Sequence, residues 1–199
     1  MTRRLEQGGR IARERPLNFT FNGRAFQGFE GDTLASALLA NGVDLVARSW
    51  KYHRPRGVLS AGVEEPNALV QLFEGGRTVP NARATEVELV DGLVARSVNA
   101  HPSVDFDARA VNGWFSRLMP AGFYYKTFMA SQAAWHFFER HIRRASGLGE
   151  APVVADAGRY DKRFAHCDVL IVGGGIAGLC AALAAGRTGA RVIVCDEQS

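Results

Sequence analysis

The feature that most constrains this chain is a glycine-rich turn between an apolar strand and an alanine-rich helix. The segment Val169–Val172 precedes Gly173, Gly174, Gly175, Ile176, Ala177 and Gly178, and a run of helix-forming residues follows. A G-x-G-x-x-G turn in this setting is typical of dinucleotide-binding folds. Its first glycine allows a tight turn, its second lets a pyrophosphate approach, and its third lets the helix pack closely on the sheet. The helix N-terminus then offers N–H groups to the phosphates.

A second apolar strand is predicted at Arg191–Cys195, and it ends in Asp196 and Glu197. In dinucleotide-binding folds, an acidic residue about 20 positions after the first glycine binds a ribose hydroxyl. An acid at this place favours NAD or FAD over NADP, because it would repel a 2′-phosphate. We therefore predict cofactor-binding residues from Gly173 to Gly178 and at Asp196 and Glu197, with no catalytic residue and no metal ligand in this chain.

The same segment has an alternative interpretation as a membrane span. Residues 169–186 form a run of eighteen uncharged residues, which is the minimum length for a transmembrane helix. Three consecutive glycines would weaken such a helix near its start, and the run begins with strand-forming residues. A strand, a turn and a helix fit the pattern better, so no membrane partner is expected.

The N-terminal part has the pattern of a small domain with a sheet and one helix. Residues 17–29 alternate around Asn22-Gly23, which predicts a hairpin with a type I′ turn. A helix is predicted from a cap at Asp32 or Thr33 to Asn41-Gly42. Further strands are predicted at 68–73 and near 85–90. A hairpin followed by a helix is how a β-grasp, ferredoxin-like domain begins, and we place this α+β domain at residues 1–100.

The middle of the chain differs in composition. Aromatic residues recur at spacings of three or four between residues 114 and 144, which predicts helices with a buried stripe. Residues 147–166 are mixed and rich in turn formers, and they are expected to form a connector. We therefore place a helical segment and connector at 101–166. Residues 167–199 are predicted to be an incomplete βαβ unit of an α/β Rossmann-type FAD/NAD-binding domain.

The cysteines argue against an iron–sulfur cluster. A plant-type [2Fe–2S] domain needs C-x₄-C-x₂-C after its helix, but residues 42–100 contain no cysteine, and Lys51–Gly57 lie in that part of the chain. The three cysteines present, Cys167, Cys180 and Cys195, are expected to be buried thiols. His53, His101 and His166 have no evident partners, so we predict a cluster-free domain and no metal site.

The net charge and the N-terminal sequence indicate which binding partners and which cellular compartment to expect. The net charge of +4 is too small and too dispersed for a dedicated nucleic-acid binder. One loop, Arg48–Arg56, combines four basic residues with Trp50, Tyr52 and a histidine. Either it binds an anionic ligand, an acidic partner or nucleic acid, or it is a solvated loop with inward-packing aromatics. The first residues lack the apolar core of a secretory signal, so a cytoplasmic location is expected.

Several segments together resemble the alpha subunits of heterotetrameric sarcosine oxidases. The resemblance covers essentially the whole chain and rests on residues 1–10, 29–43, 49–57, 64–67, 122–129 and 168–199. It implies that the chain is the N-terminal part of a longer subunit. It also implies that the NAD site lies in this subunit, FAD and FMN lie in the beta subunit, and gamma and delta subunits complete the complex.

The activity implied by this resemblance is the oxidative demethylation of sarcosine to glycine. Oxygen would become hydrogen peroxide, and the one-carbon unit would pass to tetrahydrofolate. Two alternatives stay open from the residues alone. In one, the chain belongs to a related FAD- or NAD-dependent amine or opine dehydrogenase whose nucleotide site is catalytic. In the other, it is a truncated scaffold without catalysis.

Overall fold

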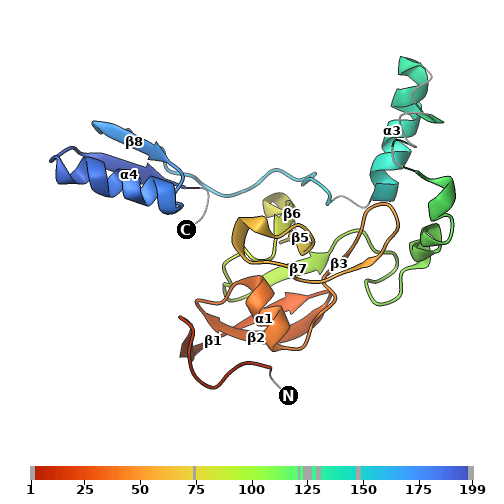
Figure 1. Cartoon of the computed structure of the whole chain (residues 1–199), viewed down its shortest axis with the longest axis horizontal. Helices are drawn as coiled ribbons and strands as arrows, with labels where there is room; N and C mark the ends of the chain where they lie inside the picture. Colours follow the sequence, from red (N-terminus) through yellow and green to blue (C-terminus); the bar gives the residue numbers. More distant parts are fainter. Residues whose placement is uncertain are drawn as a thin grey trace. The chain divides into compact units, whose positions relative to one another are not determined.

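In the computed structural model, the chain forms two compact units, Met1–Asp156 and Ala157–Ser199 (Figure 1). The structure describes residues 3–73, 75–120, 122, 127–128, 131–146 and 149–196. The predicted residue Glu197 lies outside them. The predicted boundaries at residues 100 and 166 remain predictions.

The first unit is built on a mixed five-stranded sheet with the strand order β2-β1-β7-β5-β6. Strands β1 and β7 are parallel, and the other neighbouring pairs are antiparallel. A separate two-stranded ladder joins β3 to β4. The strands are β1 (Ala12–Phe21), β2 (Arg24–Glu30), β3 (Ala47–Arg48), β4 (Pro55–Arg56), β5 (Leu69–Leu72), β6 (Val79–Arg83) and β7 (Leu93–Ser97).

The predicted hairpin is confirmed. Strands β1 and β2 pair antiparallel up to Phe21 and Arg24, and the turn residues Asn22 and Gly23 have φ angles of 51° and 74°. Two consecutive positive φ angles are the requirement of a type I′ turn, which asparagine and glycine meet at low cost. Local chemistry at two residues therefore sets the register of this hairpin.

Helix α1 (Leu34–Ala40) packs against this sheet and is also confirmed. Thr33 caps it, with the Thr33 hydroxyl accepting from Ser36 N and the Ser36 hydroxyl accepting from Thr33 N. Such a reciprocal capping box satisfies donors that the helix leaves open. The core residues contributed by the helix and the sheet include Leu34, Ala37, Leu38, Phe19, Phe21, Val70, Leu93 and Ala95.

The strand predicted near residues 85–90 is wrong. Backbone carbonyls within and just before this stretch accept hydrogen bonds from the first turn of α1 instead: Leu34 N donates to Val87 O, and Ala35 N donates to Ala84 O, both at 2.8 Å. Because these carbonyls serve the helix, they are not available to a sheet ladder. Leu89 still contributes to the core, which explains the apolar pattern that suggested a strand.

The prediction of helices after residue 100 holds in part. Residues Ala108–Gly113 (η3) and Ser116–Leu118 (η4) form short 3₁₀ helices, and an α-helix, α3, spans Gln132–Ser146. The buried stripe is wrong for the 3₁₀ stretch, because Trp114 is 85% exposed and Leu118 is 71% exposed. A 3₁₀ turn is too short to present a continuous apolar face. Most of residues 123–129 lie outside the described part of the chain.

Part of the predicted connector is attached to the first unit. Gly149 N donates to Asn81 Oδ1 at 2.9 Å, and Gln71 exchanges two hydrogen bonds of 3.1 Å with the backbone of Glu150. These contacts join the segment after α3 to strands β5 and β6. They explain why the first compact unit extends to Asp156.

The second unit confirms the predicted strand–turn–helix–strand order. It contains β8 (Val169–Val172), α4 (Ile176–Arg187) and β9 (Val192–Cys195), and the two strands pair in parallel. Among the described residues, no helix is both long and apolar enough to cross a membrane. The expectation of buried thiols is wrong here, since Cys180 and Cys195 are exposed and Cys167 is partly exposed.

Candidate nucleotide-binding site

The candidate site lies where β8 and β9 end and α4 begins. Gly173 N donates to Cys195 O at 2.8 Å, so the glycine turn continues directly from the strand pair. At the other end of the strands, Arg191 donates three hydrogen bonds to the Asp168 carboxylate at 2.9–3.2 Å. The hydrogen bonds from Arg191 lower the pKa of Asp168, and the same contact raises the pKa of Arg191. This exposed pair adds to the parallel pairing of β8 with β9, which brings Gly173 beside the end of β9.

The three motif glycines are under different physical constraints. Gly173 has a φ of 106°, a conformation that side-chain-bearing residues rarely adopt. A Cβ on Gly178 would overlap the carbonyl oxygen of Gly173, so only glycine fits between the helix and the turn. A Cβ on Gly175 would meet nothing within 4 Å, and its φ of −65° suits any residue. The protein itself therefore does not require glycine at position 175.

The N-terminus of α4 is open. Gly175 is its N-cap, and no side chain in the described part of the chain caps it. The first amides of a helix have no partners within the helix, and their dipoles favour anions. In this type of turn the second glycine lets a phosphate approach the backbone closely, and the space around position 175 is open. The open helix start at Gly175, Ile176, Ala177 and Gly178 is therefore compatible with the predicted phosphate contacts of a dinucleotide.

The structure brings the predicted acid to the same place. Asp196 follows β9, and its carboxylate accepts a hydrogen bond from Gly174 N. Carboxyl ends of adjacent parallel strands meet at one edge of the sheet, which is where nucleotides bind in such folds. Gly173, Gly174, Gly175, Ile176, Ala177, Gly178 and Asp196 thus form one cluster.

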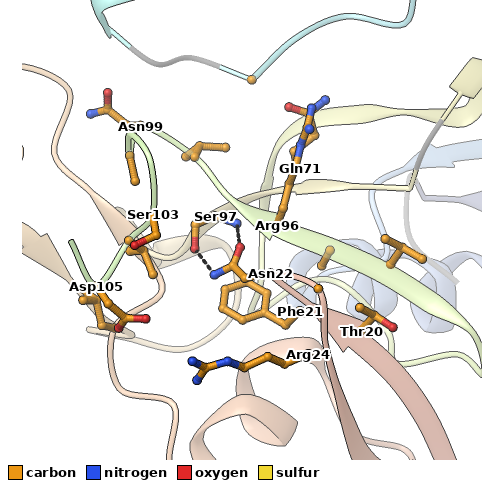
Figure 2. A pocket seen from close by; sticks show the side chains of 18 of the residues that line it. Thr20, Phe21, Asn22, Arg24, Gln71, Arg96, Ser97, Asn99, Ser103 and Asp105 are labelled. Atoms are coloured by element: carbon orange, nitrogen blue, oxygen red, sulfur yellow. Dashed lines mark hydrogen bonds between the residues drawn. The ribbon is translucent and has the colours of Figure 1, made fainter. Parts of the chain in front are cut away.

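A second concave surface lies wholly within the first unit and contains none of the predicted site residues. Figure 2 shows it beside the hairpin turn, where Asn22 and Ser97 exchange two hydrogen bonds of 2.8 Å. Its volume is about 1600 Å³, and Arg24, Arg96 and Gln71 are among its lining residues. Small-molecule pockets are usually smaller and mostly apolar. This surface is therefore not the candidate site.

The basic loop Arg48–Arg56 makes mainly internal contacts. Arg48 donates to Val104 O at 2.9 Å and His53 O at 3.1 Å, Lys51 donates to Pro120 O at 3.0 Å, and the Tyr52 hydroxyl donates to Met119 O at 2.8 Å. These bonds join the loop to residues 104–120. They agree with the interpretation of a solvated loop with inward-packing aromatics for Tyr52, but not for Trp50, whose side chain is 49% exposed.

His53, which has no evident partner in the sequence, has one in the structure. Its Nδ1 lies 2.6 Å from Asp107 Oδ2, and both side chains are fully buried. Asp107 Oδ1 also accepts from the backbone N–H groups of His101 and Arg109, at 3.1 Å each. The partner is 54 positions away in the sequence, so no local pattern indicates it. In the described part of the chain, no three His, Cys, Asp or Glu residues form a potential metal site.

Comparisons with known proteins agree with the two-part organisation. A family model described as a 2Fe-2S iron-sulfur cluster binding domain matches residues 14–100, and one described as FAD dependent oxidoreductase matches residues 168–199. The alpha subunit of sarcosine oxidase from Rhizobium meliloti (strain 1021) is 59% identical over 197 residues, which are 98% of this chain and 20% of that protein. This chain is a sequence relative of sarcosine oxidase alpha subunits. The predicted resemblance is confirmed.

The alpha subunit from Corynebacterium sp. (strain U-96) is a more distant relative, 35% identical over 96% of this chain and 15% of its own length. The chain therefore spans only 15–20% of these relatives. A solved structure, L-proline dehydrogenase from P. horikoshii, aligns at 23% identity over 43% of this chain and 16% of its own, with a TM-score of 0.33, too low to define a shared fold. By sequence, residues 14–100 resemble a ferredoxin-type domain and residues 168–199 resemble the start of an FAD-dependent oxidoreductase domain.

Proposed function

We propose that the second unit contributes the phosphate- and ribose-binding half of a dinucleotide site. The observation that carries this proposal is Gly175, whose missing side chain opens space at an uncapped helix N-terminus. The chain's residues bind and orient the nucleotide: the first amides of α4 hold phosphate, and the Asp196 carboxylate accepts from a ribose hydroxyl. The bound nucleotide supplies the capacity to exchange electron pairs with a substrate.

We further propose that the nucleotide at this site is NAD. The acid at position 196 disfavours a 2′-phosphate and is compatible with NAD or FAD, and the resemblance to sarcosine oxidase alpha subunits favours NAD. FAD is the second candidate, and the match of residues 168–199 to FAD dependent oxidoreductases favours it. In that case the nucleotide site of this chain would itself be catalytic, as in a related amine or opine dehydrogenase.

At the level of the complete protein, we propose that the chain is part of an alpha subunit of a heterotetrameric sarcosine oxidase. Such a complex, with beta, gamma and delta subunits, would convert sarcosine and oxygen to glycine and hydrogen peroxide, with the one-carbon unit taken up by tetrahydrofolate. FAD and FMN would belong to the beta subunit, so this chain would contribute nucleotide binding and packing. The 59% identity to such an alpha subunit supports this assignment. The first domain is proposed to be a β-grasp domain without a cluster.

The binding proposal is tested by identifying the nucleotide that the complete subunit releases on acid extraction. Chromatography should recover NAD from the wild type and none from Gly175→Val, because the new side chain would occupy the phosphate path. Gly186→Val is the matched control, since a Cβ there also meets nothing, but the position lies near the other end of α4. Recovery of FAD alone would contradict the NAD assignment. Equal nucleotide content in the two variants would contradict the site.

The assignment of activity needs a separate test. The purified complex should produce hydrogen peroxide when sarcosine is added, and tetrahydrofolate should lower the amount of free formaldehyde released. Peroxide production without any effect of tetrahydrofolate would contradict the one-carbon part. No turnover of sarcosine, together with oxidation of another secondary amine, would favour the dehydrogenase alternative.

A further inference from the structure

The carboxylate of Glu65 is the centre of a loop in the first unit. Its Oε2 accepts from the backbone N–H groups of Leu59 and Ser60, both at 2.7 Å. Its Oε1 accepts from Asn67 N at 2.6 Å and Ala68 N at 3.0 Å. Glu65 is only 1% exposed. One buried carboxylate therefore joins the two halves of the loop that leads from β4 to β5.

The ionised form of this carboxylate is the one that the loop stabilises. Burial alone would raise the pKa of Glu65, but the four backbone N–H groups act in the opposite direction, and the pKa lies below its ordinary value. The donors are backbone amides, so the arrangement depends on the path of the chain and not on a neighbouring basic side chain. A buried amide without an acceptor is costly, which makes the carboxylate and the loop mutually dependent.

The position of Glu65 matches a cluster motif in its spacing but not in its chemistry. Ser60, Glu65 and Ala68 have the C-x₄-C-x₂-C spacing of plant-type [2Fe–2S] domains. They lie in the domain that the cluster-binding family model matches. A hydroxyl, a carboxylate and a methyl group stand where three thiolates would be needed, and residues 14–100 contain no cysteine. The residues present do not fit the cluster.

The loop at the position of the cluster motif differs from the one expected from the sequence. The sequence predicts Lys51–Gly57 in this position, but the loop whose amides converge on one side chain is 59–68. The Ser60 hydroxyl is consistent with a remodelled site, because it is buried and has no hydrogen-bond partner among the described residues. Thr85 Oγ1 donates to Gly62 O at 2.8 Å and holds the outer turn of this loop.

We propose that the Glu65 carboxylate replaces an iron–sulfur cluster as the organising centre of this loop. A cluster is an anionic acceptor whose sulfurs take hydrogen bonds from the surrounding protein. The Glu65 carboxylate is also an anionic acceptor, and it uses both oxygens for two amides each. The domain then folds without iron and transfers no electron, and its contribution to the protein is structural.

Hydrogen exchange of the complete subunit, followed by mass spectrometry of peptides covering residues 58–69, tests this role. In the wild type these peptides should exchange slowly. In Glu65→Ala they should exchange at least about tenfold faster, because four backbone amides lose their charged acceptor. Glu65→Gln should be intermediate, since its amide group keeps one neutral oxygen as acceptor. The matched control is Glu64→Gln, which alters the exposed neighbouring carboxylate and should exchange like the wild type.

Incubation of the wild type with iron and sulfide under anaerobic conditions supplies the second readout. The same peptides should exchange at an unchanged rate, because no thiolates are present to bind a cluster. Slower exchange after this treatment would overturn the proposal, as would wild-type exchange in Glu65→Ala. If Glu65→Ala does not fold, Glu65→Gln decides: wild-type exchange in that variant overturns the proposal, and faster exchange supports it.

Discussion

Two loops of this molecule gather backbone N–H groups around one point, and they do so in opposite ways. In the loop 59–68, four amides converge on the Glu65 carboxylate, which is buried within the chain. In the loop 173–178, no side chain of the described residues caps the start of α4, and Gly175 leaves open space there. The first loop provides its own anion, whereas the second leaves room for one.

This difference separates a structural loop from a binding loop. An anion supplied by the chain is always present, so the amides around it contribute to folding. An anion supplied by a ligand is present only when bound, so the protein must keep its amides accessible at the expense of stability. Glycine residues mark the second case because they remove side chains from the path of the ligand. The two loops should therefore respond differently to substitution.

The largest effect is expected for Gly178→Ala. Its Cβ would overlap the Gly173 carbonyl oxygen, which belongs to the backbone and has little freedom to move. We expect a loss of about 3 kcal/mol or more in the stability of the second unit, at the upper end for overpacked sites. Faster hydrogen exchange of peptides covering residues 168–196 would report it. Gly175→Ala is the control, and equal exchange in the two variants would contradict this account.

The second-largest effect is expected when acid protonates Glu65 in the loop 59–68. The folded-state pKa of Glu65 lies below the ordinary value of 4.5, so the carboxylate stabilises the loop at every pH above that value. This contribution is lost as the pH falls through the lower, folded-state pKa, when Glu65 becomes protonated. Exchange of residues 58–69, corrected for the intrinsic pH dependence of amide exchange, should therefore rise below pH 4.5. In Glu65→Gln this rise should be absent.

The sequence predicts those parts of the fold that depend on neighbouring residues. Asn22-Gly23, the Thr33 cap and the turn at Gly173 each act within a few positions, and all three are found as expected. The sequence does not predict contacts between residues that are far apart along the chain. The stretch 85–90 alternates like a strand, but its Val87 carbonyl accepts from α1, and His53 contacts Asp107 only in the folded chain.

The candidate nucleotide site was predictable for the same reason. Its glycines and Asp196 belong to one short βαβ unit, so sequence spacing and spatial proximity coincide. The loop around Glu65 was not predicted, because its centre is defined by four amides that converge only in the folded chain. Without cysteines, the 60, 65, 68 spacing singles out no position in the sequence.

A smaller effect is expected for Asp196→Asn. The substitution removes the charge that would accept from a ribose hydroxyl and repel a 2′-phosphate. The affinity of the nucleotide-free complete subunit for NAD should fall roughly tenfold. This loss corresponds to the low end of the free energy that a hydrogen bond to a charged group contributes. Discrimination against NADP should weaken at the same time. Titration calorimetry with both nucleotides measures the two changes, and unchanged affinity for both would contradict the assigned role of Asp196.

The smallest effect is expected for Ser60→Ala, which lies in the same loop as Glu65. The Ser60 hydroxyl is buried without a hydrogen-bond partner among the described residues, so its removal breaks no side-chain contact, while the backbone N–H of Ser60 still donates to Glu65. Stability should not fall, because a buried hydroxyl without a partner gives the folded chain no favourable hydrogen bond. By contrast, Ser36→Ala should cost about 1 kcal/mol, because the Ser36 hydroxyl completes the capping box of α1 and donates to Asp32 at 2.6 Å. Hydrogen exchange of peptides from the first unit compares the two variants. If Ser60→Ala proves as costly as Ser36→Ala, then the loop depends on more than the carboxylate at its centre.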